Sequence, residues 1–134
     1  ATKVFWARGL WHVKERTSHS VQIAWERHVH MDLPARFVNH SCDANLGIRD
    51  NALGAFDFFA LRPISPGEEL TWDYAAAEYD IVSISECLCG SLRCRGVGGL
   101  KGFKHNADVV RKQYGEYFAN YLRSPCPAWM YQGK

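Results

Sequence analysis

Four cysteines supply the ligand set of a metal site. Thiolates bind zinc tightly, and a structural zinc ion takes four ligands in a tetrahedral arrangement. Three of the thiols fall within the eight residues from Cys87 to Cys94, while the fifth cysteine, Cys126, lies apart. This spacing, without a secretory segment at the start of the sequence, favours metal binding over disulfides or free buried thiols. We therefore predict one structural zinc ion bound by Cys42, Cys87, Cys89 and Cys94.

The same cysteines belong to a longer ordered pattern. It consists of Arg36 to Asn45 (RFVNHSCDAN), Phe59 to Ile64 (FALRPI) and Gly67 to Tyr74 (GEELTWDY), followed by the cysteine cluster. From about Gln22 to Gly96, this pattern resembles the C-terminal half of a SET domain followed by a post-SET zinc module. The resemblance implies a mainly β, SET-type fold with a small amount of helix, in which the first and third motifs form a pseudoknot.

The resemblance also implies an activity and a site. SET domains move a methyl group from S-adenosylmethionine to an amine, so we expect an N-methyltransferase acting on a protein lysine or another amine. Tyr74 would be the active-site tyrosine, with Asp73 beside it. A phenol can hydrogen-bond the lysine nitrogen and stabilise charge where the methyl group is transferred. The residues that would bind S-adenosylmethionine are Arg36, Phe37, Asn39, His40, Trp72 and Leu88.

One departure from the family pattern concerns glycine. A full SET domain begins with a Gly-x-Gly turn, and glycine lets a backbone approach a ligand closely. Only 38 residues precede Asn39 here, and the stretch from Ala7 to Trp11 has a single glycine, Gly9. The sequence therefore either starts after the cofactor-binding strands of a longer domain or is a naturally short SET-like protein. In both cases we expect weak or undetectable binding of S-adenosylmethionine.

This departure keeps a second function open, in which a SET-like protein does not depend on S-adenosylmethionine. The aromatic pocket around Trp72, Asp73 and Tyr74 would then catalyse a different reaction in small-molecule metabolism, or would bind a partner. In the catalytic version, Asp73 and Tyr74 would act as a proton-transfer pair. Calorimetry with S-adenosylmethionine distinguishes the two hypotheses, because only the first requires binding.

Hydrophobic periodicity predicts short strands followed by a helix. Alternating apolar residues indicate the strands, and Asn106 has the residue type of an N-cap for a helix beginning near Ala107, with Val110, Tyr114 and Tyr121 on its apolar face. The expected strands are 4–13 with a break at 8–9, 19–25, 28–31, 54–61 and 69–72, with a hairpin turn at 26–27. The expected domains are a SET-like domain over 1–82 that lacks the usual Gly-x-Gly strand, a post-SET zinc module over 83–99, and a C-terminal helix and tail over 100–134.

Composition limits the partners. The chain has 134 residues and a net charge of +2, which is too balanced to indicate direct binding to nucleic acid. No apolar run reaches the length that crosses a membrane, so we expect an intracellular protein of the cytoplasm or nucleus. The expected substrate is a protein lysine or a small molecule. An apolar edge strand favours a homodimer in which a second chain covers Val4, Phe5, Trp6 and Trp11.

Overall fold

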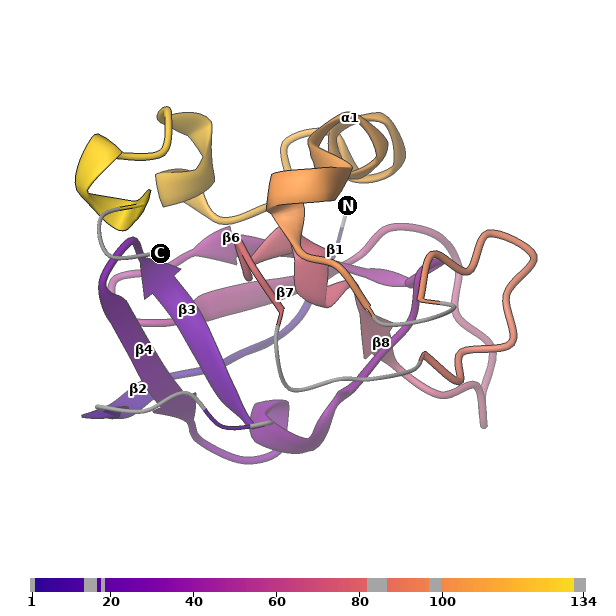
Figure 1. Cartoon of the computed structure of the whole chain (residues 1–134). Coiled ribbons are helices and arrows are strands. Elements are labelled where there is room, and N and C mark those ends of the chain that lie inside the picture. Colours follow the sequence, from indigo (N-terminus) through magenta and orange to yellow (C-terminus); the bar gives the residue numbers. More distant parts are fainter. Residues whose placement is uncertain (1, 14–16, 18, 82–86, 97–99, 132–134) are drawn as a thin grey trace.

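The structure, a computed structural model, describes residues 2–13, 17, 19–81, 87–96 and 100–131. The described residues form eight strands in two sheets (Figure 1). The five-stranded sheet has the order β1 (Thr2–Trp6), β7 (Phe56–Ala60), β6 (Leu46–Asp50), β8 (Thr71–Trp72) and β5 (Asn39–His40). The three-stranded sheet has the order β2 (Gly9–Val13), β4 (Arg27–Met31) and β3 (Ser20–Ala24). The prediction of a mainly β fold with a small amount of helix is confirmed.

The remaining elements are helical and mostly short. The α-helix in the described residues, α1, spans Phe103–Tyr114. The 3-10 helices are η1 (Ala35–Phe37), η2 (Tyr74–Ala76), η3 (Asn120–Arg123) and η4 (Ala128–Tyr131). In the part of the chain that the structure describes, no helix has the length and apolar character needed to span a membrane.

The N-terminal ribbon joins the two sheets. β1 pairs with β7 in one sheet and β2 pairs with β4 in the other, so the predicted break at residues 8–9 is the passage between them. Gly9 packs directly against the loop before β7: its N–H donates to the Leu53 carbonyl oxygen at 2.9 Å, and an added Cβ would lie only 2.4 Å from the Gly54 carbonyl oxygen. Glycine is required here because two backbones touch.

The hairpin between β3 and β4 turns one residue earlier than predicted. Arg27 pairs with Ala24, which leaves Trp25 and Glu26 in the turn. The strand β6 was missed altogether. Leu46, Gly47 and Ile48 are all buried, so β6 lacks the alternation that marks a strand with one solvated face. A Cβ at Gly47 would lie 2.5 Å from the Cβ of Tyr117, so the C-terminal segment covers this strand.

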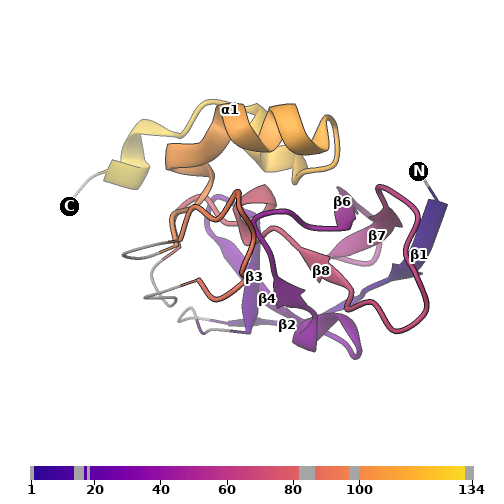
Figure 2. The same ribbon diagram turned by 90° about the vertical axis from the view of Figure 1, so that its right-hand side faces the viewer.

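The C-terminal segment forms a layer over the sheets, as Figures 1 and 2 show. α1 begins earlier than predicted, at Phe103 with Gly102 as its N-cap, but it is kinked at Asn106, so its second segment begins at Ala107, where the helix was expected. Asn106 lies within the helix in a non-helical conformation (φ −132°, ψ 20°), and its side-chain amide donates to the carbonyl oxygens of Lys101 and Gly102, both at 3.1 Å. A short side chain that bonds nearby carbonyls competes with regular helix geometry.

The core lies between the sheets and this C-terminal layer. Ile48, Phe56, Phe58 and Val110 are fully buried, and each such side chain stabilises the fold by roughly 1.5–3 kcal/mol. Of the predicted apolar helical face, Val110 and Tyr114 are buried in the same core cluster as Phe103 and Phe118, whereas Tyr121 lies beyond α1, in η3. Helix α1 ends at Gly115, whose φ of 60° suits a residue without Cβ.

Candidate functional site

Two of the sequence motifs lie side by side in the structure. β5 and β8 pair in parallel, with Asn39 opposite Thr71 and His40 opposite Trp72. The N–H of Ser41 extends the pairing by donating to the Trp72 carbonyl oxygen at 3.2 Å. The expected association of these segments is therefore confirmed, and their threading as a pseudoknot stays a prediction.

Tyr74 is fixed at both its backbone and its side chain. Its N–H donates to His40 Nδ1 at 2.9 Å, and its hydroxyl donates to the Val38 carbonyl oxygen at 3.1 Å. Burial, and next the charge of Glu78, raise the pKa of the phenol above its ordinary value. Tyr74 is therefore a neutral hydrogen-bond donor over the whole neutral and mildly alkaline range.

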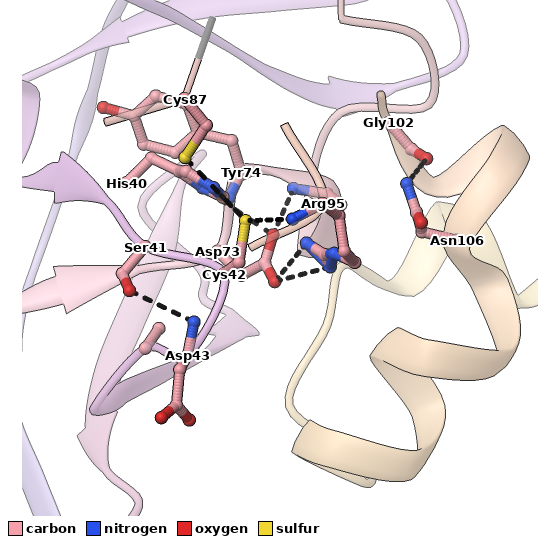
Figure 3. A network of polar contacts seen from close by, with 12 residues as sticks. His40, Ser41, Cys42, Asp43, Asp73, Tyr74, Cys87, Arg95, Gly102 and Asn106 are labelled. Atoms are coloured by element: carbon pink, nitrogen blue, oxygen red, sulfur yellow. Dashed lines mark hydrogen bonds and ion pairs between the residues drawn. The ribbon is translucent and has the colours of Figure 1, made fainter. Parts of the chain in front are cut away.

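His40 connects Tyr74 to the cysteine cluster. Burial lowers the pKa of this imidazole to about 4, against the raising effect of Asp73 and with a smaller lowering effect of Arg95. The ring is therefore neutral at pH 7. Because Nδ1 accepts the Tyr74 N–H, the ring proton is on Nε2, and it points at the Cys42 sulfur 3.3 Å away. Figure 3 shows His40 between Tyr74 and Cys42.

The Asp73 carboxylate is 1% exposed and is held entirely by protein donors. Its Oδ2 accepts hydrogen bonds from two guanidinium nitrogens of Arg95, at 2.6 and 3.1 Å, and from the Tyr114 hydroxyl at 2.9 Å. Its Oδ1 accepts from the Ala75 N–H at 3.0 Å, which caps the turn that begins with Tyr74. Predicted as catalytic, Asp73 lies behind the tyrosine, in a position suited to hold that turn in place (Figure 3).

A cavity of about 470 Å³ opens beside Tyr74. Of the residues predicted to bind S-adenosylmethionine, Asn39, His40 and Leu88 line it. Ser41, Glu69 and Thr71 also line it and are not among the predicted site residues. The Glu69 carboxylate accepts a hydrogen bond from the Asn39 side chain at 2.8 Å.

The other three residues predicted for cofactor binding do not line this cavity. Arg36 Nε donates to the Met31 carbonyl oxygen at 2.8 Å. Phe37 is 58% exposed and contacts the edge of the His19 ring. Trp72 is buried behind the cavity, edge-on to Phe58. Their motif positions gave no information on which way the side chains face.

The four predicted zinc ligands come together. The sulfur atoms of Cys42, Cys87, Cys89 and Cys94 all lie within 4.8 Å of one another, and Cys42 and Cys87 are 3.8 Å apart. Zinc–sulfur bonds of about 2.3 Å in a tetrahedron place sulfurs roughly 3.8 Å apart, so the set fits a zinc ion. Cys126 is not part of the cluster, as expected.

The local backbone also suits a closed thiolate site. The Arg95 N–H donates to the Cys42 sulfur at 3.3 Å. Gly96 lets the chain return past Cys87, because an added Cβ would lie 2.0 Å from the Cys87 Cβ. Burial raises the pKa of Cys42, and partial burial raises the pKa of Cys87 to about 11, so without a cation these two thiols are protonated at pH 7. Zinc binding would therefore release protons.

Helix α1 contributes side chains to this region that the sequence gave no sign of. Tyr114 donates to Asp73, and the Gln113 amide donates to the Cys42 carbonyl oxygen at 3.0 Å. Arg95 carries a weak sequence signal, since it sits directly after Cys94. Tyr114 and Gln113 lie about 40 and 70 residues from their partners, beyond any local pattern.

Comparison with known proteins agrees with this architecture. Residues 10–75 match the family model of the SET domain. Histone-lysine N-methyltransferase, H3 lysine-9 specific KMT1 of Fusarium mangiferae is 40% identical over 80 residues, covering 48% of this chain and 23% of that protein. The H3 lysine-9 specific dim-5 enzyme of Neurospora crassa is 38% identical over 84 residues, covering 50% and 25%.

Two further proteins are similar. Histone-lysine N-methyltransferase ash1 of Drosophila melanogaster is 40% identical over 74 residues, covering 53% of this chain and 3% of that protein. A crystal structure of KRYPTONITE in complex with mCHG DNA and SAH has a TM-score of 0.46 and 31% identity, covering 59% of this chain and 20% of that one. The chain spans a quarter or less of the length of these relatives.

The mainly β fold, the paired Asn-His and Trp-Asp-Tyr segments and the family match together define the class of protein. Through residues 10–75, this chain belongs to the SET domain family.

Proposed function

We propose that this chain carries the active-site region of a protein-lysine N-methyltransferase. The main support is the position of Tyr74, whose ring lines the cavity while its hydroxyl is held on the Val38 carbonyl oxygen. The relatives named above are histone-lysine N-methyltransferases, so a histone lysine is the first substrate class to test.

The cavity has a donor set that suits S-adenosylmethionine. Asn39, Ser41 and Thr71 supply polar groups, Glu69 supplies a carboxylate, and Leu88 supplies an apolar surface. Such a mixture of a few polar groups with apolar walls is typical of small-molecule sites. Asn39, His40 and Leu88 would hold the cofactor, which supplies an electrophilic methyl group when it is bound. Asn39 is already oriented by its hydrogen bond to Glu69.

Tyr74 would orient the lysine amine. The amine attacks only in its neutral form, with its lone pair directed at the methyl carbon, so alignment supplies much of the rate enhancement. A protonated phenol fixed on Val38 directs its oxygen lone pairs toward the incoming amine, and these lone pairs accept an amine N–H. His40 and Asp73 keep the phenol in position through the Tyr74 N–H and the turn after it.

The four cysteines would bind one structural zinc ion, as a post-SET module does. The zinc would fix the loop that carries Leu88, because Cys87 and Cys89 flank this residue and Leu88 lines the cavity. Metal binding would thus complete one wall of the cavity.

One observation favours the second candidate function, a SET-like protein without S-adenosylmethionine dependence that catalyses a different reaction or acts as a binding module. Gly9, the single glycine in the N-terminal stretch, packs on Gly54 and does not line the cavity. The close backbone approach expected from the family's glycine pair is therefore absent from the described lining.

Calorimetric titration with S-adenosylhomocysteine separates the two functions. The methyltransferase hypothesis predicts saturable binding with one site per chain, weak because one wall lacks the glycine turn, and reduced in Asn39→Ala. If the titration gives no heat of binding, with protein whose zinc content and fold have been verified, the result supports the second function instead.

We further propose that the protein is intracellular and forms a homodimer through β1. In the described sheet β1 pairs only with β7, and Val4 and Trp6 on it are 44% and 63% exposed. Exposed apolar edge strands tend to be covered by another chain. Sedimentation of the chain and of Trp6→Lys tests this, since the charge at the edge should shift the protein to monomer.

A further inference from the structure

The charges of this chain are distributed unevenly along the sequence. Residues 1–86 hold 8 lysines and arginines against 12 aspartates and glutamates, whereas residues 87–134 hold 8 against 2. The whole-chain net charge of +2 hides this asymmetry. A strong charge difference between two parts of a chain indicates a polyanionic partner for the basic part.

The basic part lies on one side of the molecule. It consists of the cysteine-rich loop and the C-terminal layer, which covers the sheets in Figure 2. Four exposed cations on α1 and this loop are called the basic face from here on: Arg93, Lys104, Arg111 and Lys112.

A hollow of about 560 Å³ lies between the loop and α1. Its lining contains Arg93, Arg95 and Lys112 together with Gln113 and Val109, and no acidic side chain. Arg95 is committed to Asp73 through its two terminal nitrogens, but its Nε is buried and has no hydrogen-bond partner within the described residues. The hollow therefore offers two exposed cations, Arg93 and Lys112, that have no counter-charge among its lining residues, beside Arg95, which is paired with Asp73.

Three cations of the first part of the chain are paired with acids, unlike the exposed cations beside the hollow. Lys3, Arg8 and Arg62 in the first part of the chain form ion pairs with Asp57, Asp32 and Glu68. Within the described part of the chain, no ion pair involves Arg93, Arg111 or Lys112, although all three are exposed. The two acids of the basic part, Asp108 and Glu116, also form none there.

A second cationic hollow lies on the other flank of α1. It has a volume of about 350 Å³, and Lys104, Arg111 and Arg123 line it beside aromatic side chains. The guanidinium carbons of Arg111 and Arg123 lie 6.0 and 4.4 Å from the centre of the Phe118 ring, and both residues are exposed. Two such hollows on either side of one exposed helix suit the regularly spaced charges of a nucleic-acid backbone better than one short acidic segment.

We propose that the basic face binds the phosphate backbone of duplex DNA, independently of base sequence. Arginine guanidinium groups match phosphate oxygens in geometry, and each phosphate contact releases counterions. The acidic first part of the chain repels a polyanion, so binding is directed to this one face. This proposal replaces the sequence-based expectation of no direct contact with nucleic acid, which relied on the summed charge. It stands independently of the methyltransferase activity.

The test is a fluorescence-anisotropy titration of labelled duplex DNA with the whole chain at several salt concentrations. We expect binding at low salt that weakens steeply as salt rises and is equal for two unrelated sequences. The double variant Arg93→Ala with Lys112→Ala should bind several-fold more weakly and reduce the slope of log K against log salt by about 2. The matched control, Lys3→Ala with Arg27→Ala, removes the same charge from the other part of the chain and should leave affinity and slope nearly unchanged.

Three results would overturn the proposal. Equal weakening by the two double variants would mean that only net charge matters. No binding at low salt would exclude DNA as the partner. Displacement of bound DNA by polyglutamate at equal charge concentration, with the same sensitivity to the Arg93 and Lys112 changes, would identify an acidic protein as the occupant. Circular dichroism of each variant verifies that the fold is intact.

Discussion

Arg95 donates two hydrogen bonds to Asp73 Oδ2, one from each terminal nitrogen of its guanidinium group, at 2.6 and 3.1 Å. Asp73 immediately precedes Tyr74, and Arg95 immediately follows Cys94, one of the four proposed zinc ligands. This ion pair therefore ties the turn that carries the tyrosine to the cysteine-rich loop. The Tyr114 hydroxyl adds a third donor to the same carboxylate from α1, at 2.9 Å.

The first prediction concerns this ion pair. Arg95→Met leaves a carboxylate that is 1% exposed without its countercharge, which should lower the free energy of unfolding by about 3–5 kcal/mol. Tyr114→Phe removes one hydrogen bond to the same charge and should cost about 1.5–3 kcal/mol. Urea denaturation measures both. If Arg95→Met lowers the free energy of unfolding by less than Tyr114→Phe does, the ion pair has no structural role.

The second prediction concerns the metal. Freshly purified, reduced protein should contain one zinc ion per chain by elemental analysis, because four sulfurs lie within 4.8 Å of one another. Cys89→Ser should lose the metal and much of the thermal stability, since the binding free energy of a structural zinc contributes to folding. Cys126→Ser is the matched control and should retain both. A protein without zinc that keeps its stability in a strong chelator would contradict the assignment.

The third prediction separates cofactor binding from general stability. Asn39→Ala removes a cavity-lining amide that Glu69 orients, and it should weaken S-adenosylhomocysteine binding roughly tenfold, the value of a lost hydrogen bond of about 1.4 kcal/mol. Asn120→Ala, an exposed asparagine in η3, should have no effect. Equal affinity in Asn39→Ala and the unchanged chain would remove Asn39 from the site.

The fourth prediction follows from the raised pKa of Tyr74. The Tyr74 phenol has a pKa above its ordinary value of 10.0, so it stays neutral throughout the range from pH 7 to 9. The substrate lysine becomes more reactive as it loses its proton, with an ordinary pKa of about 10.4. The methyl-transfer rate should therefore rise steadily from pH 7 to 9 with no falling limb from the tyrosine. A decline between pH 8 and 9, in protein that remains folded, would mean that Tyr74 ionises earlier than its buried position allows.

Local chemistry made the metal cluster and the motif segments predictable. Cys87, Cys89 and Cys94 are close in sequence, and the ordered motifs connected them to distant Cys42. The strands with one solvated face were also predictable, because alternation reports a half-buried strand. Asn39, His40 and Leu88 line one cavity, and their role in binding a cofactor stays a prediction.

Other features depend on long-range packing and gave no local signal. β6 is buried on both faces because Tyr117 covers Gly47, so its residues do not alternate. The first turn of α1, before the kink at Asn106, was not predicted, because Asn106 has the residue type of a cap; its side chain bonds the carbonyl oxygens of Lys101 and Gly102. The direction of Phe37, outward toward His19, is set by the tertiary path of η1.

The most direct test of the central claim is methyl transfer itself, followed by mass spectrometry of histone proteins incubated with the chain and S-adenosylmethionine. The account predicts methyllysine with the unchanged chain and none with Tyr74→Phe, although that variant keeps its zinc, its fold and its affinity for S-adenosylhomocysteine because only a hydroxyl is lost. Undiminished methyllysine with Tyr74→Phe, or none with zinc-loaded, cofactor-binding wild-type protein on any histone, would contradict it.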